Sequence, residues 1–269
     1  MKITITKEVL LQEAKKVLQF LFKLPEINII LIKEVQIQSI KDESSIRKAI
    51  DKCFHDIYSD IDIEIKMNLH PKEFHSNQPI YADYLGRIGF NNDILGISHY
   101  CTEERGEVIR ICKRNGVRFD LIISAYCVDG IPLLPHNRIS EDSKKVDGFW
   151  FTAVQALGKL MRKDYLIASH LSHALTQEGL VLQMILRDQE YNTNYHRYGY
   201  AEELNYLTVL NNEDILFDKT SDRTFNYIAR LIYSAVKSYD ILYSSLNPSY
   251  QSRLENFINI WFFYKESLK

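Results

Sequence analysis

Apolar and polar residues alternate strictly along the segment DIYSDIDIEIKM, residues 56–67. Successive side chains of a β-strand point to opposite faces, so Asp60, Asp62 and Glu64 share one face and the isoleucines between them share the other. Aspartate at alternate positions disfavours a strand, because its strand propensity is low and like charges repel. The pattern therefore predicts a strand whose acidic face lies next to a positive charge, and a divalent cation is the leading candidate.

The chain before this strand has the pattern of a helix, a strand region and a second helix. Apolar residues recur at helical spacing over residues 7–23, and Pro25 follows. The runs INIILI (27–32) and VQIQSI (35–40) predict either one bent strand or two short strands. Residues 42–54 then predict a helix that leads into the acidic strand.

A hairpin is predicted over residues 107–126, because two β-rich runs flank Asn115-Gly116, the strongest short signal for a tight turn. Asp120 is a lone acid in the otherwise apolar second strand. Residues 130–145 carry two prolines and a polar run, which predicts a linker.

From Val146 onward the spacing of apolar residues changes to three and four, and four helices are predicted. The fold class that follows is a mixed α/β domain, residues 1–145, followed by an all-helical domain, residues 146–269. The apolar end of the last helix is expected in the core or at the face of a homodimer.

Composition narrows the function classes. The chain has 269 residues, is 46% hydrophobic and carries a net charge of −2, which suits a globular protein and gives no electrostatic case for a nucleic-acid or membrane-surface binder. Its four cysteines form no CxxC pair and are expected to be reduced thiols. The start of the chain lacks the apolar core of a signal peptide, and no apolar run is long enough to span a bilayer. A cytoplasmic protein is expected.

Two acids on one strand face, with a third on another strand, would make an oxygen-rich site. Such a site suits Mg²⁺, which prefers carboxylates, water and phosphate oxygens. Paired ions of this kind bind the phosphates of a nucleoside triphosphate and assist in-line displacement at phosphorus.

The segment YSDIDIEI resembles the Asp-x-Asp strand of the polymerase-beta-type nucleotidyltransferases. More closely, the chain resembles the bacterial aminoglycoside 6-adenylyltransferases and lincosamide nucleotidyltransferases. The strand VRFDLIIS is similar to the strand that carries their third acid, and DGFWFTAVQALGKLMRKDYLIASHL is similar to their aromatic-rich helix pair. NPSYQSRLENFI is similar to their final helix.

The resemblance implies a nucleotidyltransferase-like domain with a mixed sheet. Asp60 and Asp62 would hold Mg²⁺, and Asp120 would either complete the metal site or accept the proton of the acceptor hydroxyl. ATP would be the co-substrate, and the acceptor would be a small hydroxylated molecule such as an aminoglycoside or a lincosamide. Ser39 and Ser59 are the candidates for contact with the nucleotide.

The chain departs from that family at two places. The family has a Gly-Ser turn before the acidic strand, whereas this chain has no glycine before Gly86, and Ser39 is the nearest substitute. His170 stands where the 6-adenylyltransferases carry an aspartate that is a suggested base, and a histidine can accept a proton at neutral pH.

Structural alternatives exist for each candidate. Asp60 and Asp62 could form the solvated face of an edge strand, and Asp120 could belong to a buried ion pair. His170 could be a surface or packing histidine. The rival hypothesis for the whole chain is a catalytically degenerate protein of the same fold that binds a nucleotide, another ligand or a protein.

Overall fold

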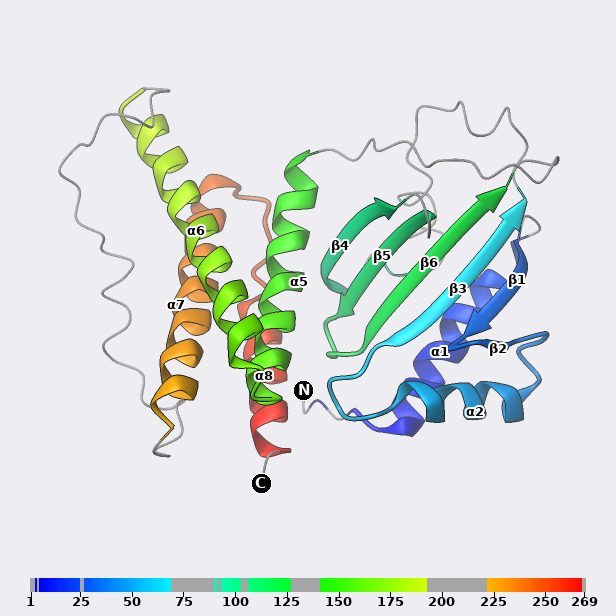
Figure 1. The fold of residues 1–269 in the computed structure, drawn as a ribbon. Helices are drawn as coiled ribbons and strands as arrows, with labels where there is room; N and C mark the ends of the chain where they lie inside the picture. Colours follow the sequence, from blue (N-terminus) through cyan, green and yellow to red (C-terminus); the bar gives the residue numbers. More distant parts are fainter. Residues whose placement is uncertain are drawn as a thin grey trace. The chain divides into compact units, whose positions relative to one another are not determined.

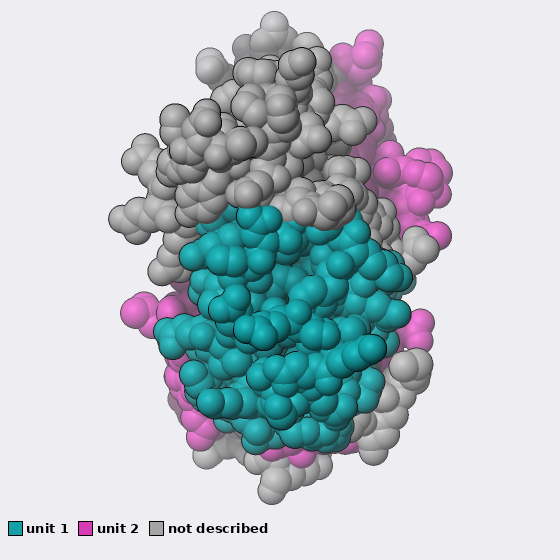
Figure 2. Space-filling view, turned by 90° about the vertical axis from the view of Figure 1, so that its right-hand side faces the viewer, with its two compact units in different colours: residues 1–151 teal, residues 152–269 magenta. Residues whose placement is uncertain are grey.

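A computed structural model of the chain describes residues 3, 5–24, 27–68, 90, 93–102, 106–126, 141–192 and 222–267. The chain divides into two compact units, unit 1 (residues 1–151) and unit 2 (residues 152–269), drawn in separate colours in Figure 2. The predicted domain boundary after residue 145 and the unit boundary after residue 151 both fall within one helix, α5 (Glu141–Met161).

Unit 1 is built around a six-stranded sheet (Figure 1). The strand order is β2-β1-β3-β6-β5-β4, in which β3 and β6 are parallel and every other neighbouring pair is antiparallel. This mixed sheet with helices confirms the predicted fold class of the first half. The elements in chain order are α1 (Lys7–Leu21), β1 (Ile27–Ile32), β2 (Val35–Gln36), α2 (Glu43–Cys53), β3 (Ile61–Asn68), β4 (Ile94–Thr102), β5 (Gly106–Lys113) and β6 (Arg118–Tyr126).

One face of the sheet is apolar and covered by α1 and α2 (Figure 1). The alternating isoleucines of β3 lie on this face and are fully buried, as are Phe119 and Leu121 of the neighbouring β6. Burial of each large apolar side chain stabilises the fold by about 1.5–3 kcal/mol. The isoleucines of β3 therefore determine which face of the strand points into the core. The acids of β3 must consequently lie on the opposite face.

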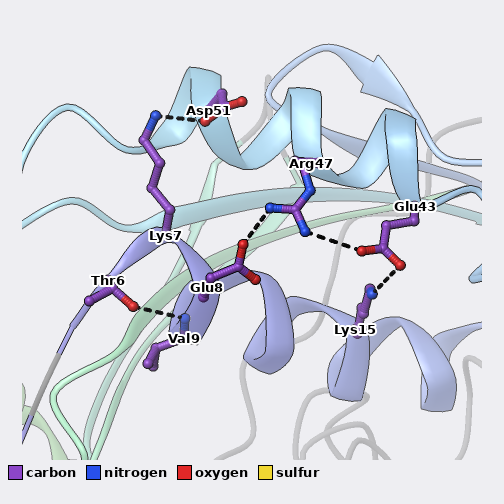
Figure 3. Close-up of polar contacts among 8 residues, drawn as sticks. All are labelled: Thr6, Lys7, Glu8, Val9, Lys15, Glu43, Arg47 and Asp51. Atoms are coloured by element: carbon purple, nitrogen blue, oxygen red, sulfur yellow. Dashed lines mark hydrogen bonds and ion pairs between the residues drawn. The ribbon is translucent and has the colours of Figure 1, made fainter.

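Helices α1 and α2 are joined by exposed ion pairs (Figure 3). Arg47 of α2 contacts Glu8 of α1 and Glu43 of its own helix, while Lys7 contacts Asp51 at 2.6 Å. Pairs this exposed contribute about 0–1 kcal/mol each, so the apolar contacts beneath them supply most of the stability.

The hairpins β1–β2 and β5–β6 have short turns. The predicted turn at Asn115-Gly116 is confirmed, with Gly116 at φ 84° and the Asn115 side-chain oxygen accepting a hydrogen bond of 3.1 Å from Val117 N–H. Strands β1 and β2 are two short strands, one of the two predicted alternatives, and they are joined by Lys33 and Glu34 at φ 45° and 66°.

Two parts of unit 1 differ from the prediction. Strand β4 was not predicted from its sequence, ILGISHYCT. Within the predicted linker at 130–145, residues 130–140 lie outside the described residues, but residues 141–145 belong to α5, so the linker prediction is wrong there. A polar run that contains Glu and Asp does not exclude a helix, because acids are favoured in the first turn.

Unit 2 is helical, as predicted, and contains the rest of α5 with α6 (Tyr165–Glu190), α7 (Arg223–Leu246) and α8 (Leu254–Glu266). The buried Asp240 of α7 accepts hydrogen bonds from the hydroxyls of Tyr250 and Ser252 and from Arg253 N–H, at 2.9, 2.6 and 3.1 Å. This carboxylate holds the short connection between α7 and α8. Within the described part of the chain, no helix combines the length and the apolarity needed to cross a membrane.

Gly96 of β4 marks where the middle of α5 packs closely on the sheet. A Cβ added at Gly96 would lie 2.2 Å from Phe151 N and 2.7 Å from the Trp150 carbonyl carbon. Both contacts are with backbone, which cannot move aside as a flexible side chain can. The position therefore requires glycine for close approach.

We expect Gly96→Ala to lower the free energy of unfolding by at least about 1–3 kcal/mol, because the extra methyl group overpacks a rigid contact. Gly179→Ala in α6 is the matched control, since nothing lies within 4 Å of a Cβ built there. That change should raise the free energy of unfolding by about 0.5–1 kcal/mol through helix propensity. Urea unfolding monitored by circular dichroism measures both values, and equal effects would contradict the close packing at Gly96.

Candidate functional site

Strand pairing brings the acids of the two predicted segments together. In the parallel pair β3–β6, Asp62 lies directly opposite Asp120, and in the antiparallel pair β5–β6, Arg110 lies opposite Asp120. Asp60 immediately precedes β3, and its carboxylate lies 3.6 Å from the Arg110 guanidinium. Asp60, Asp62 and Asp120 thus gather on the sheet face that α1 and α2 do not cover.

Two side-chain cations lie among these carboxylates. The Nε–H of Arg110 donates to both carboxylate oxygens of Asp120, at 3.0 and 3.1 Å. The guanidinium carbon also lies 5.1 Å from the centre of the Phe151 ring, within the range of a cation–π contact. The Lys33 ammonium donates to an Asp62 oxygen at 2.8 Å, and this ion pair raises the pKa of Lys33. The positive charge predicted beside the acidic face is therefore supplied by the chain itself.

A pocket of about 420 Å³ opens on this face. Its volume is within the range of about 300–1,000 Å³ that is typical of small-molecule sites. Acidic, basic, apolar and aromatic side chains all contribute to it, so that it offers both charged and apolar contacts. The lining residues are Lys33, Glu34, Asp62, Glu64, Tyr100, Val108, Asp120, Ile122 and Ser124.

Asp120 has the most altered acidity of the site. Burial and the neighbouring Asp60 charge raise its pKa to about 6, while Arg110 opposes this rise. Its carboxylate is consequently divided between the charged and neutral forms near pH 6, and it is a stronger base than an ordinary aspartate.

The other predicted site residues lie elsewhere. The Ser39 hydroxyl accepts a hydrogen bond from Lys41 N–H at 3.2 Å, within its own turn. Ser59 is buried and its hydroxyl accepts from the backbone N–H of His55 and of Asp56, both at 3.1 Å. Neither serine lines the pocket. Their predicted contact with a nucleotide stays a prediction.

His170 lies on α6 in unit 2 and is exposed. It belongs to a different unit from the carboxylates. Its predicted role as a base stays a prediction.

Lys33 and Arg110 are the site residues that the sequence reasoning missed. For Arg110 the predicted hairpin was a signal, but the register depends on the length of its loop. The observed three-residue loop, residues 114–116, aligns position 110 with position 120, whereas a two-residue turn at Asn115-Gly116 would have aligned position 111 with it. Lys33 gave no such signal, because its place beside Asp62 depends on the pairing of β1 with β3.

The carboxylates fit a divalent cation in kind but are not arranged around one. Oxygen donors are what Mg²⁺ requires. The pKa of Asp120 is raised first by burial and then by repulsion from Asp60, and a bound cation would relieve the repulsion. Among the residues that the structure describes, however, no three His, Cys, Asp or Glu side chains form a metal-binding group. Lys33 and Arg110 instead bind the oxygens of Asp62 and Asp120.

Comparison with known proteins adds a distant likeness. No family model matches this chain, and no curated protein matches it. Among solved structures, an aminoglycoside 6-adenyltransferase from Bacillus subtilis aligns over 97% of this chain and 99% of its own, with 11% sequence identity and a TM-score of 0.32. A likeness this distant says nothing about the activity of this chain.

The raised pKa of Asp120 makes stability depend on pH. Protonation favours the folded state, so the contribution of this group is fully present below its ordinary pKa of 3.8 and is lost as pH rises through about 6. We expect Asp120→Asn, which cannot ionise, to be more stable than the wild type by on the order of 1–3 kcal/mol at pH 7.5. The advantage should shrink as pH falls from 6 to 4.

Urea unfolding at a series of pH values measures this difference. Asp51→Asn is the control, because Asp51 forms an exposed ion pair with Lys7 and its loss should matter by less than about 1 kcal/mol at any pH. An Asp120→Asn protein whose stability relative to the wild type is the same at pH 4.5 and pH 7.5 would show that Asp120 ionises normally.

Proposed function

We propose that this protein transfers a nucleoside monophosphate from a nucleoside triphosphate, with ATP as the first candidate, to a hydroxyl group of a small acceptor. Mg²⁺ is the proposed cofactor. Aminoglycosides and lincosamides are the acceptors to test first. Unit 1 would supply the carboxylates that the reaction needs.

One observation carries the proposal. Asp60, Asp62 and Asp120 come from two separate stretches of the chain and meet on one face of the sheet, beside a pocket of about 420 Å³. Three carboxylates in one place are costly unless a cation or a reaction uses them. Enzymes that transfer phosphoryl groups use such carboxylates to hold divalent ions against phosphate oxygens.

The reaction makes one bond and breaks one. The acceptor oxygen bonds to the α-phosphorus, the bond from that phosphorus to pyrophosphate breaks, and the hydroxyl proton leaves to a base. Asp60 and Asp62 would hold Mg²⁺, which when bound supplies positive charge against the triphosphate. Asp120 would either complete that ligand set or accept the proton, for which its pKa of about 6 is well suited. His170 is the second candidate for the base.

A second candidate function is a degenerate domain that binds a ligand without turnover. Two observations favour it. No glycine precedes Gly86, so the segment between β2 and α2 has no residue that lets the backbone wrap a triphosphate closely. In addition, Lys33 and Arg110 form ion pairs with Asp62 and Asp120 without a metal.

Pyrophosphate release separates the two candidates. We expect release from ATP and Mg²⁺ in the presence of at least one acceptor from a panel of aminoglycosides and lincosamides. Asp60→Asn and Asp62→Asn should each lower the rate by about 10²-fold or more, because loss of metal-mediated charge stabilisation costs several kcal/mol in the transition state. Asp51→Asn, on α2, should leave the rate unchanged.

The outcomes are distinct. Binding of ATP without pyrophosphate release on any acceptor would favour the degenerate domain. Failure to bind either ATP or Mg²⁺ at millimolar concentration would remove both nucleotide functions. Release that persists in Asp62→Asn would show that these carboxylates do not carry the reaction.

A further inference from the structure

Arg110 is held in place from three directions. Backbone pairing of β5 with β6 sets it opposite Asp120, and its Nε–H bonds to both oxygens of that carboxylate at 3.0 and 3.1 Å. Its guanidinium reaches to 3.6 Å from Asp60 and lies over the ring of Phe151. The side chain therefore bridges two of the three acids from a fixed position, and it is only 23% exposed.

Lys33 lies beside Asp62 because of the backbone conformation of the turn between β1 and β2. Lys33 and Glu34 adopt φ values of 45° and 66°, which residues with a Cβ adopt at a cost of about 1–2 kcal/mol each. Lys33 N–H bonds to the Asp62 carbonyl at 3.3 Å, and the Lys33 ammonium bonds to the Asp62 carboxylate at 2.8 Å. Positive φ at both central residues is the usual conformation of a two-residue hairpin turn, so the turn between β1 and β2 fixes the position of Lys33.

Each carboxylate of the trio thus contacts a cation: Arg110 of β5 contacts Asp60 and Asp120, and Lys33 of the turn between β1 and β2 contacts Asp62. Arginine and lysine are also the side chains that bind phosphate best, the first by parallel hydrogen bonds and the second as a point charge. No glycine is among the described residues that line the pocket. Arg110 and Lys33 can fill two roles if they bind the carboxylates in the empty site and phosphate in the filled site.

We propose that Arg110 and Lys33 are exchangeable counter-ions. They form ion pairs with Asp60, Asp62 and Asp120 while the site is empty, and they bind the phosphate oxygens when a metal-bound polyphosphate enters. The inference deepens the proposed function and depends on it for the identity of the ligand. It implies that a divalent cation alone binds weakly, because it must displace two cations that gain no new partner. Metal and polyphosphate together bind well, because the displaced cations are paired again.

The test is a double variant, Arg110→Met with Lys33→Met, and two ligands whose affinities should change in opposite directions. Mn²⁺ alone, followed by electron paramagnetic resonance, should bind the variant about tenfold or more tightly than the wild type, because its competitors are gone. The Mn²⁺ complex of the α,β-methylene analogue of ATP, followed by calorimetry, should bind the variant about tenfold or more weakly, because its phosphate contacts are gone.

The matched control is Arg47→Met with Lys7→Met, which also removes one arginine and one lysine charge, but from the exposed ion pairs between α1 and α2 (Figure 3). It should leave both affinities unchanged. Arg110→Lys with native Lys33 retains the charge, and we expect Mn²⁺ affinity closer to the wild type than to the double variant. Far-UV circular dichroism confirms that each protein is folded.

Opposite shifts for the two ligands support the inference, because a merely structural pair of cations would weaken both or neither. Equal Mn²⁺ affinity in the wild type and the double variant would overturn it, as would equal affinity for the analogue complex. Neither measurement uses turnover, so failure to release pyrophosphate would count against the proposed function without affecting these results. Absence of binding by either ligand to every protein would overturn both.

Discussion

The parallel pairing of β3 with β6 is the constraint on which the site depends. Their register sets Asp62 opposite Asp120, and the apolar face beneath prevents either strand from turning its acids away. Negative charge is therefore fixed on one surface by the same contacts that stabilise the domain. The energetic consequence appears in the raised pKa of Asp120 and in the two cations drawn to the carboxylates. Packing thus places negative charges close together, and the side chains of Lys33 and Arg110 compensate them in part.

Much of this arrangement follows from the sequence, and the reasons are specific. Alternation along β3 indicated which face carries acid, and Asn115-Gly116 located a turn that the structure confirms. What could not be predicted depends on contacts distant in sequence. Lys33 meets Asp62 only through the pairing of β1 with β3. Strand β4 contains a glycine whose reason is the backbone of α5, which no local pattern reveals.

The composition of the pocket favours a ligand with both charge and an apolar part. Val108 and Ile122 line it together with Asp62, Glu64 and Lys33, while Tyr100 adds an aromatic ring. A ligand made only of phosphates would leave the apolar residues unused, and a purely apolar ligand would desolvate the acids without compensation. Nucleotides combine an aromatic base with charged phosphates, and in this respect the pocket suits the class of substrate proposed for it. The same mixture would suit a ligand-binding domain without catalytic activity.

The close approach at Gly96 has a consequence for how this chain can diverge. Because the helix backbone at Phe151 touches Gly96, and the Phe151 ring lies over Arg110, the three positions are mechanically linked. A larger residue at position 96 would push the helix outward and remove the ring from the guanidinium. In relatives of this protein, substitutions at positions 96, 110 and 151 are accordingly expected to be correlated, so that evolution changes them as a group.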